Sequence, residues 1–157
     1  MIDKILIATD GSDSAHEVLQ LGLDLAGEQD AETFVLHVAP RVVAIPCVSF
    51  AKATPTIPHK LTEHDRKPLH EALEIAERRG IVVETELLQG NPAYEIVTYA
   101  DTIDADLIVV GSCGHGAVAS AAIGSVSRGV LLESRRPVLV VRGPHVAAGV
   151  PARAAVR

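Results

Sequence analysis

Short runs of Ile, Leu and Val alternate along the chain with segments in which apolar residues recur every three or four positions. Continuous short apolar runs are typical of strands buried on both faces, and the longer spacing is typical of amphipathic helices. This pattern predicts five strands, at residues 4–9, 33–38, 82–88, 107–110 and 138–141. The third strand alternates apolar and polar residues, so we expect it at an edge of the sheet.

Four helices are predicted between these strands. Two are defined by apolar positions at helical spacing, which are Ala15, Val18, Leu19, Gly22, Leu25 and Ala26 in the first and Leu69, Ala72, Leu73 and Ala76 in the second. The third begins at Asn91, a residue type favoured at N-caps, followed by Pro92 at the first helical position. The fourth begins near Ser125 and ends before Pro137, with its apolar register at Val126, Val130 and Leu131.

Strands that alternate with helices in this way predict an α/β fold, a single doubly wound open parallel sheet with helices on both faces. The chain has 157 residues, which is the size of one domain. We expect this domain at residues 1–143 and a flexible C-terminal tail at 144–157. The connection at residues 40–63 carries Pro46, Pro55 and Pro58 without clear periodicity, and we expect a lid or a mobile loop there.

Charge and composition exclude several classes of function. Fourteen Lys and Arg against 20 Asp and Glu give a net charge of −6, the wrong sign for a protein that binds nucleic acid. Residues 107–127 contain no Lys, Arg, Asp or Glu, but their glycines argue against a membrane span. Cys47 and Cys113 lie far apart without zinc-site spacing, and no signal peptide precedes the charged start, so a cytoplasmic location is expected.

The candidate chemistry lies in residues 111–125, a Gly-rich segment between an apolar strand and a helix. Glycines let main-chain amides approach a ligand closely, and the helix offers its positive end, so a phosphate chain is the expected ligand. Two other phosphate motifs fit poorly. Residues 114–119 match the dinucleotide fingerprint, but no acid ends a following strand, and a P-loop would need a lysine that this region lacks. The spacing of His59, His64 and His70 favours a solvated loop over a metal site.

The glycine segment resembles the motif G-x2-G-x9-G-[ST] of the ATP-binding universal stress protein family, through Gly111, Gly114, Gly124 and Ser125. The resemblance extends to KILIATDGSDSA at the start, LHV at residues 36–38, ADLIVVGS at 105–112, GSVS at 124–127 and PVLVVR at 137–142. It covers nearly the whole domain except residues 40–63 and the tail. It implies the strand order 3-2-1-4-5, which brings the ends of the first and fourth strands together at the point where ligands bind in such sheets.

The resemblance also implies a role for each matched residue. Asp10 would accept hydrogen bonds from ribose hydroxyls, and Gly111 would face the ribose. The residues that would border the adenine are Ala8, Thr9 and Val38. The residues that would offer main-chain amides or hydroxyls to the phosphates are Gly114, Gly124, Ser125, Val126 and Ser127. For Asp10, a role as a turn or capping carboxylate before the first helix is the alternative.

The resemblance thus implies an ATP-binding protein, with Mg²⁺ as an expected companion of the nucleotide, that acts in stress response or regulation. Arg128 is the only nearby cationic side chain and no catalytic base is evident, so binding is favoured over fast turnover. A slow ATP hydrolase that uses the same site is an alternative. Another is a nucleotide-free interaction module. The family resemblance and the apolar last strand together predict a homodimer that forms through that strand.

Overall fold

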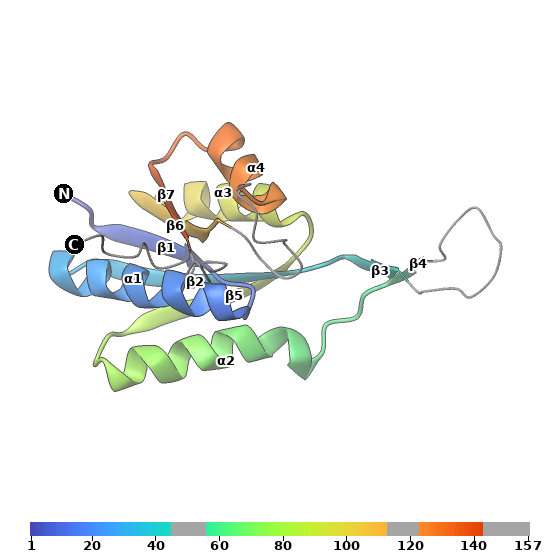
Figure 1. Cartoon of the computed structure of the whole chain (residues 1–157), viewed down its shortest axis with the longest axis horizontal. Coiled ribbons are helices and arrows are strands. Elements are labelled where there is room, and N and C mark those ends of the chain that lie inside the picture. The colour runs from blue at the N-terminus through green and yellow to red at the C-terminus, as the bar shows by residue number, and fades with distance from the viewer. Residues whose placement is uncertain (45–55, 113–122, 143–157) are drawn as a thin grey trace, which may run out of the picture.

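The computed structural model describes residues 1–44, 56–112 and 123–142 (Figure 1). Its main sheet has five parallel strands in the order β5-β2-β1-β6-β7. Their bounds are β1 Lys4–Ala8, β2 Glu32–Ala39, β5 Val83–Gln89, β6 Leu107–Gly111 and β7 Val138–Val141. Counted within this sheet the order is 3-2-1-4-5, so the predicted fold class is confirmed, and so is the edge position of the third strand.

Helices cover both faces of the sheet (Figure 1). Helices α1 (Asp13–Gln29) and α2 (Glu63–Arg78) lie on one face, and α3 (Pro92–Thr102) and α4 (Ser125–Glu133) lie on the other. The side chains of β1 alternate between the two layers, with Ile5 and Ile7 packed toward α1 and α2 and Leu6 toward α3. All three are fully buried, and burial on both faces fixes the register of this central strand.

Helix α4 differs from its predicted register. Its buried residues are Ser127 and Val130, while Val126 and Leu131 are 37% and 43% exposed. A Cβ atom placed on Gly129 would lie 2.6 Å from the Cβ of Ala93 in α3, so the two helices meet through small residues. The apolar pattern predicted Val130 correctly but missed Ser127 and Gly129, because the contact with α3 depends on small size and not on hydrophobicity.

The segment between β2 and α2 contains two further strands. Strands β3 (Val42–Ala44) and β4 (Thr56–Pro58) pair antiparallel, and we call this pair the arm. The arm projects well beyond the edge of the main sheet (Figure 1). The sequence did not predict these two strands within the expected lid or mobile loop. The rest of that segment, residues 45–55, and the expected tail at 144–157 lie outside the described residues.

A buried polar cluster holds the base of the arm against the sheet. The Asp65 carboxylate accepts hydrogen bonds from the Thr62 amide at 2.7 Å and from His59 Nε2 at 2.8 Å. The Gln89 side-chain amide donates to the carbonyls of His59 and Pro40, which joins β5, β2 and the arm. His59 is thus a partly buried partner of a carboxylate, and its predicted place on a solvated loop is wrong.

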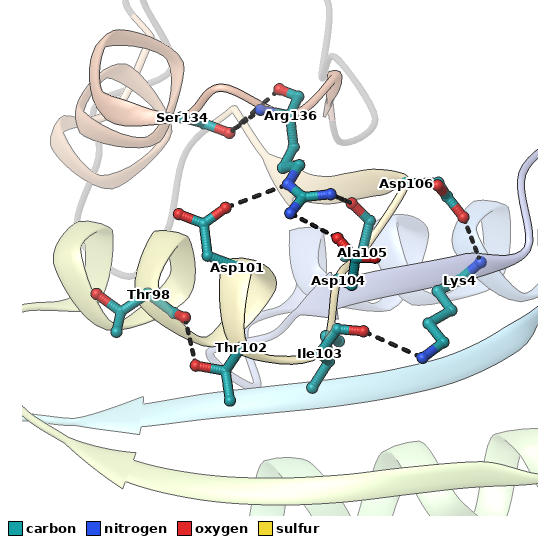
Figure 2. Close-up of polar contacts among 10 residues, drawn as sticks. All are labelled: Lys4, Thr98, Asp101, Thr102, Ile103, Asp104, Ala105, Asp106, Ser134 and Arg136. Carbon is teal, nitrogen blue, oxygen red and sulfur yellow. Dashed lines mark hydrogen bonds and ion pairs between the residues drawn. The ribbon is translucent and has the colours of Figure 1, made fainter.

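Ion pairs and hydrogen bonds close the amino edge of the sheet (Figure 2). The Arg136 guanidinium contacts Asp101 and Asp104 at 3.1 and 2.8 Å, and these carboxylates raise its pKa. The Asp106 carboxylate accepts from the amides of Asp3 and Lys4, both at 2.9 Å, which lowers its pKa. These contacts tie the start of β6 to the start of β1 and the segment before β7 to the end of α3.

The Asp65 cluster should make the free energy of unfolding depend on pH. Burial alone would raise the pKa of Asp65, but hydrogen bonds from Thr62 and His59 outweigh burial and lower this pKa to about 2. Because the folded state holds the ionised form, the contribution is present above about pH 4 and is lost as the pH falls toward 2. We expect Asp65→Asn to remove about 2 kcal/mol of this pH-dependent stability, measured by urea unfolding at pH 7, 4 and 3.

The matched control is Glu63→Gln, because Glu63 lies in the same helical turn and its side chain is 86% exposed. This variant should keep the wild-type loss of stability in acid. An Asp65→Asn protein that loses stability between pH 4 and 3 as steeply as the wild type would contradict the assignment.

Candidate functional site

A cavity of about 730 Å³ opens at the carboxyl edge of the sheet, where the strand order reverses between β1 and β6. Open α/β sheets bind their ligands at this point, and the volume suits a small-molecule ligand. Every predicted site residue that the structure describes lines this cavity. They are Ala8, Thr9, Asp10, Val38, Gly111, Gly124, Ser125, Val126 and Ser127. Gly114 lies outside the described residues.

The turn after β1 positions Asp10 at the cavity wall. Gly11 follows with a φ of +75°, and a Cβ atom there would come within 2.9 Å of the Pro68 ring in α2. Asp10 Oδ1 accepts hydrogen bonds from the Ser12 amide at 3.0 Å and from its hydroxyl at 2.6 Å, and Ser12 is the N-cap of α1. The carboxylate therefore has the turn role that the sequence left open, and it lines the cavity as well.

Main-chain groups of Val38 face the cavity side of β2. The last pairing between β1 and β2 joins Ala8 to Leu36, and the Leu36 carbonyl accepts from the Thr9 amide at 2.9 Å. Main-chain groups alternate in direction along a strand, so the N–H and C=O of Val38 point to the same side as those of Leu36. Because β1 ends at Ala8, these two groups have no strand partner among the described residues.

Hydrogen bonds join the two ends of the glycine segment, at Ser112 and Gly124, in the wall of the cavity. The Ser112 carbonyl accepts from the Gly124 amide at 2.6 Å and from the Ser127 hydroxyl at 3.2 Å. The Ser112 amide in turn donates to Val141 of β7 at 2.7 Å. The Gly124 amide thus bonds to the protein's own main chain in this structure, and its role toward the phosphates stays a prediction.

The first turn of α4 supplies amides that the helix itself does not use. Gly124 is the N-cap, and its carbonyl accepts the first intrahelical bond, from the Arg128 amide at 3.0 Å. The amides of Ser125, Val126 and Ser127 precede that bond and lie at the positive end of the helix dipole. All three residues line the cavity, so this turn can receive an anionic group.

Residues 1–142 match the model of the universal stress protein family. The chain belongs to this family. A universal stress protein of Methanocaldococcus jannaschii is 36% identical to it over 143 residues, which cover 90% of this chain and 82% of that protein. The universal stress protein YxiE of Bacillus subtilis is 36% identical over 150 residues, which cover 90% of this chain and all of YxiE.

Solved structures of universal stress proteins have the same fold. One, solved in complex with cAMP, has a TM-score of 0.66 at 25% identity and covers 89% of this chain and 96% of its own. A universal stress protein from Archaeoglobus fulgidus, in complex with dAMP, has a TM-score of 0.65 at 27% identity and covers 89% and 98%. No helix among the described residues is long and apolar enough to cross a membrane.

Several wall residues of this universal stress protein domain were missed from the sequence. They are Ala15 and Val18 of α1, Pro92 and Ile96 of α3, and His37 of β2. Pro92 carried a usable signal, because a residue at the start of a helix that follows a strand lies at the carboxyl edge of the sheet. His37 carried no such signal, and only the three-dimensional arrangement places this residue at the cavity.

Few charged side chains line the described part of the cavity wall. Among the described lining residues, Asp10 is the one carboxylate and none is Lys or Arg. Arg128 is exposed and does not line the cavity. Positive potential at this site therefore comes from the start of α4 and not from cationic side chains.

Removing the Ser127 hydroxyl should destabilise the fold more than removing the Ser125 hydroxyl. Ser127 is 1% exposed and its hydroxyl also contacts the Gly124 carbonyl at 3.1 Å, whereas Ser125 is exposed. We expect Ser127→Ala to lower the free energy of unfolding by about 1 kcal/mol. The matched variant Ser125→Ala should change it by less than about 0.5 kcal/mol. Urea unfolding of both variants measures this difference, and equal effects would show that the buried hydroxyl has no structural role.

Proposed function

We propose that this universal stress protein binds an adenine nucleotide, with ATP as the ligand, in the cavity at the carboxyl edge of its sheet, and that binding regulates a stress response. The convergence of Asp10 and the start of α4 on one cavity is the observation that carries the proposal. Two family members solved with cAMP and dAMP support an adenine nucleotide as the ligand.

The order of the strands along the cavity indicates how the bound nucleotide would be oriented. The start of α4, which follows β6, suits the phosphates. Asp10, at the end of β1, suits the ribose hydroxyls, because a carboxylate accepts strong hydrogen bonds from them. The unpaired main-chain groups of Val38, on β2, suit the polar edge of the base. Strands β6, β1 and β2 are adjacent in the sheet, so the three parts of a nucleotide meet three neighbouring strand ends in sequence.

Mg²⁺ fits this arrangement as a companion of the nucleotide. A triphosphate brings several negative charges into a wall whose described side chains include a carboxylate and no Lys or Arg. The ion would offset part of that charge, while the amides of α4 hold phosphate oxygens. Phosphoryl transfer needs cations at the leaving oxygens and a group that orients the nucleophile, so we propose binding and not turnover as the function.

Asp10→Asn tests the site. The asparagine keeps an oxygen for the Ser12 hydrogen bonds but removes the charge that would hold two ribose hydroxyls. We expect the affinity for ATP, measured by calorimetric titration with MgCl₂, to fall roughly 10- to 100-fold, because hydrogen bonds to charged groups contribute about 1.5–3 kcal/mol.

Asp13→Asn is the control, since Asp13 is exposed in the first turn of α1, does not line the cavity and carries the same charge. This variant should bind ATP like the wild type. A wild-type protein that binds neither ATP, ADP nor AMP would overturn the proposed function. Wild-type affinity in Asp10→Asn would overturn only the ribose assignment.

We further propose that the protein forms a homodimer through β7. This strand lies at one edge of the sheet, and beside it in the chain α4 exposes Leu131 and Leu132, which are 43% and 76% exposed. The carbonyls of Pro137 and Val141 face β6, because they accept from Ile108 and Ser112. The main-chain groups of Val138 and Val140 therefore point outward from the edge, where another strand could pair with them.

Val140→Pro tests the dimer, because proline removes an outward N–H and leaves the hydrogen bonds to β6 in place. We expect sedimentation velocity at about 10 µM protein to give a dimer for the wild type and a monomer for this variant. The control is Thr85→Pro on β5, the opposite edge of the sheet, which should remain a dimer. A monomeric wild type, or a dimeric Val140→Pro variant, would contradict the proposal.

A further inference from the structure

Helix α2 departs from the usual preferences of a helix at Pro68. This proline is the sixth residue of α2, where it lacks the N–H that would donate to the His64 carbonyl and its ring crowds that carbonyl. Proline is the residue least favoured inside a helix, and such departures are expected where function requires them. We propose that Pro68 is a positioning residue, which holds the turn of Asp10 in place for the ribose of the bound nucleotide. This inference rests on the proposed function and adds a residue to its site.

The ring of Pro68 packs against Gly11, the residue that follows Asp10. A Cβ atom on Gly11 would lie 2.9 Å from Cγ of Pro68 and 3.3 Å from its Cβ, so the ring fills the space that a side chain would take. Gly11 has a φ of +75°, which favours glycine, and its small size lets the two elements approach. Pro68 is not among the described residues that line the cavity, so its effect on a ligand passes through Gly11.

The turn from Thr9 to Ser12 transmits the position of Gly11 to Asp10. Asp10 Oδ1 accepts from the Ser12 amide and hydroxyl, at 3.0 and 2.6 Å. The Thr9 hydroxyl accepts from the Gly11 amide at 3.3 Å. These bonds join the turn into one unit, so a shift of Gly11 displaces the Asp10 carboxylate. A hydroxyl bonds strongly to a carboxylate only at about 2.5–2.7 Å and with good alignment, so a small displacement weakens the contact with the ribose.

The position of Pro68 is itself fixed on both sides along α2. Before it in the helix, the buried Asp65 carboxylate is bonded to the base of the arm. Directly after it, Leu69 is 5% exposed and packs in the same apolar core as Ile7 of β1. The pyrrolidine ring loses no side-chain entropy on packing, so Pro68 provides a rigid surface for the turn.

Replacing the ring separates positioning from stability. Pro68→Ala removes the contact with Gly11 but restores the helical N–H and introduces the residue most favoured in helices. We expect this variant to unfold in urea at a concentration no lower than the wild type does, and yet to bind ATP about fivefold more weakly. The second ligand is 2′,3′-dideoxy-ATP, which lacks both ribose hydroxyls. Its affinity should be unchanged, because the groups that Asp10 would bind are missing.

Both ligands are titrated calorimetrically with MgCl₂ at pH 8, where imidazole is neutral. His70→Ala is the matched control, because His70 is exposed on α2 and is not among the described residues that line the cavity. This variant should bind both ligands like the wild type. In an Asp10→Asn background, Pro68→Ala should not weaken ATP further, since the two residues act on the same contact.

Three results would overturn the inference and leave the binding of an adenine nucleotide standing. The first is undiminished affinity of Pro68→Ala for ATP. The second is equal weakening of both ligands, with or without a lower urea midpoint, which would show that Pro68 has a structural role only. The third is a wild type that binds both ligands equally well, which would also remove the ribose assignment of Asp10. A wild type that binds neither ligand would overturn the proposed function as well.

Discussion

The parallel pairing of β1 with β6 is the constraint on which the site depends. It aligns Ile5, Leu6 and Ile7 with Leu107, Ile108 and Val109, residues about one hundred positions apart in the chain. The pairing begins where the Asp106 carboxylate receives the amides of Asp3 and Lys4, and it ends where Asp10 and Gly111 reach the cavity. Because both strands start in register, their carboxyl ends deliver an acid and a glycine segment to one place.

The cavity has a polar end and an apolar end, which different elements of the fold build. Its polar end is built from the start of α4, whose position follows from the Ser112 carbonyl and from the close contact between Gly129 and Ala93. Its apolar end is built from β2 and from the first turns of α1 and α3. A ligand with an anionic tail and a flat, mostly apolar head matches this division. The adenine nucleotides in related structures have that shape.

Much of this arrangement could be predicted from the sequence, because apolar periodicity reports burial directly. Strands β1, β2, β6 and β7 are runs of Ile, Leu and Val, and the structure places each within about two residues of its predicted bounds. The order of the strands came from the family resemblance and not from the pattern. The acid and the glycine segment at two strand ends could be found from the pattern, whereas the other predicted cavity residues came from the resemblance.

The remaining features depend on contacts that one-dimensional patterns do not carry. The prolines of residues 40–63 favoured a lid or a mobile loop, yet Pro58 pairs with Val42 at the end of an isolated pair of strands, where proline is tolerated. The buried face of α4 is defined by the small residues that meet α3. The engagement of the Gly124 amide, and the place of His37 at the cavity, follow from distances between segments that lie far apart in the chain.

The amino edge of the sheet has a consequence for the electric polarity of the molecule. All four helices begin at the carboxyl edge and end at the opposite one, so their dipoles add along the strand direction. At the far edge, Lys4 donates to the carbonyl of Ile103 at the end of α3, and Arg136 donates to the carbonyl of Ala105 (Figure 2). These two cations thus satisfy carbonyls at the end of α3 and just after it, while the positive ends of the helices lie at the edge that carries the cavity. A protein with a net charge of −6 can in this way still draw an anion to one end of itself.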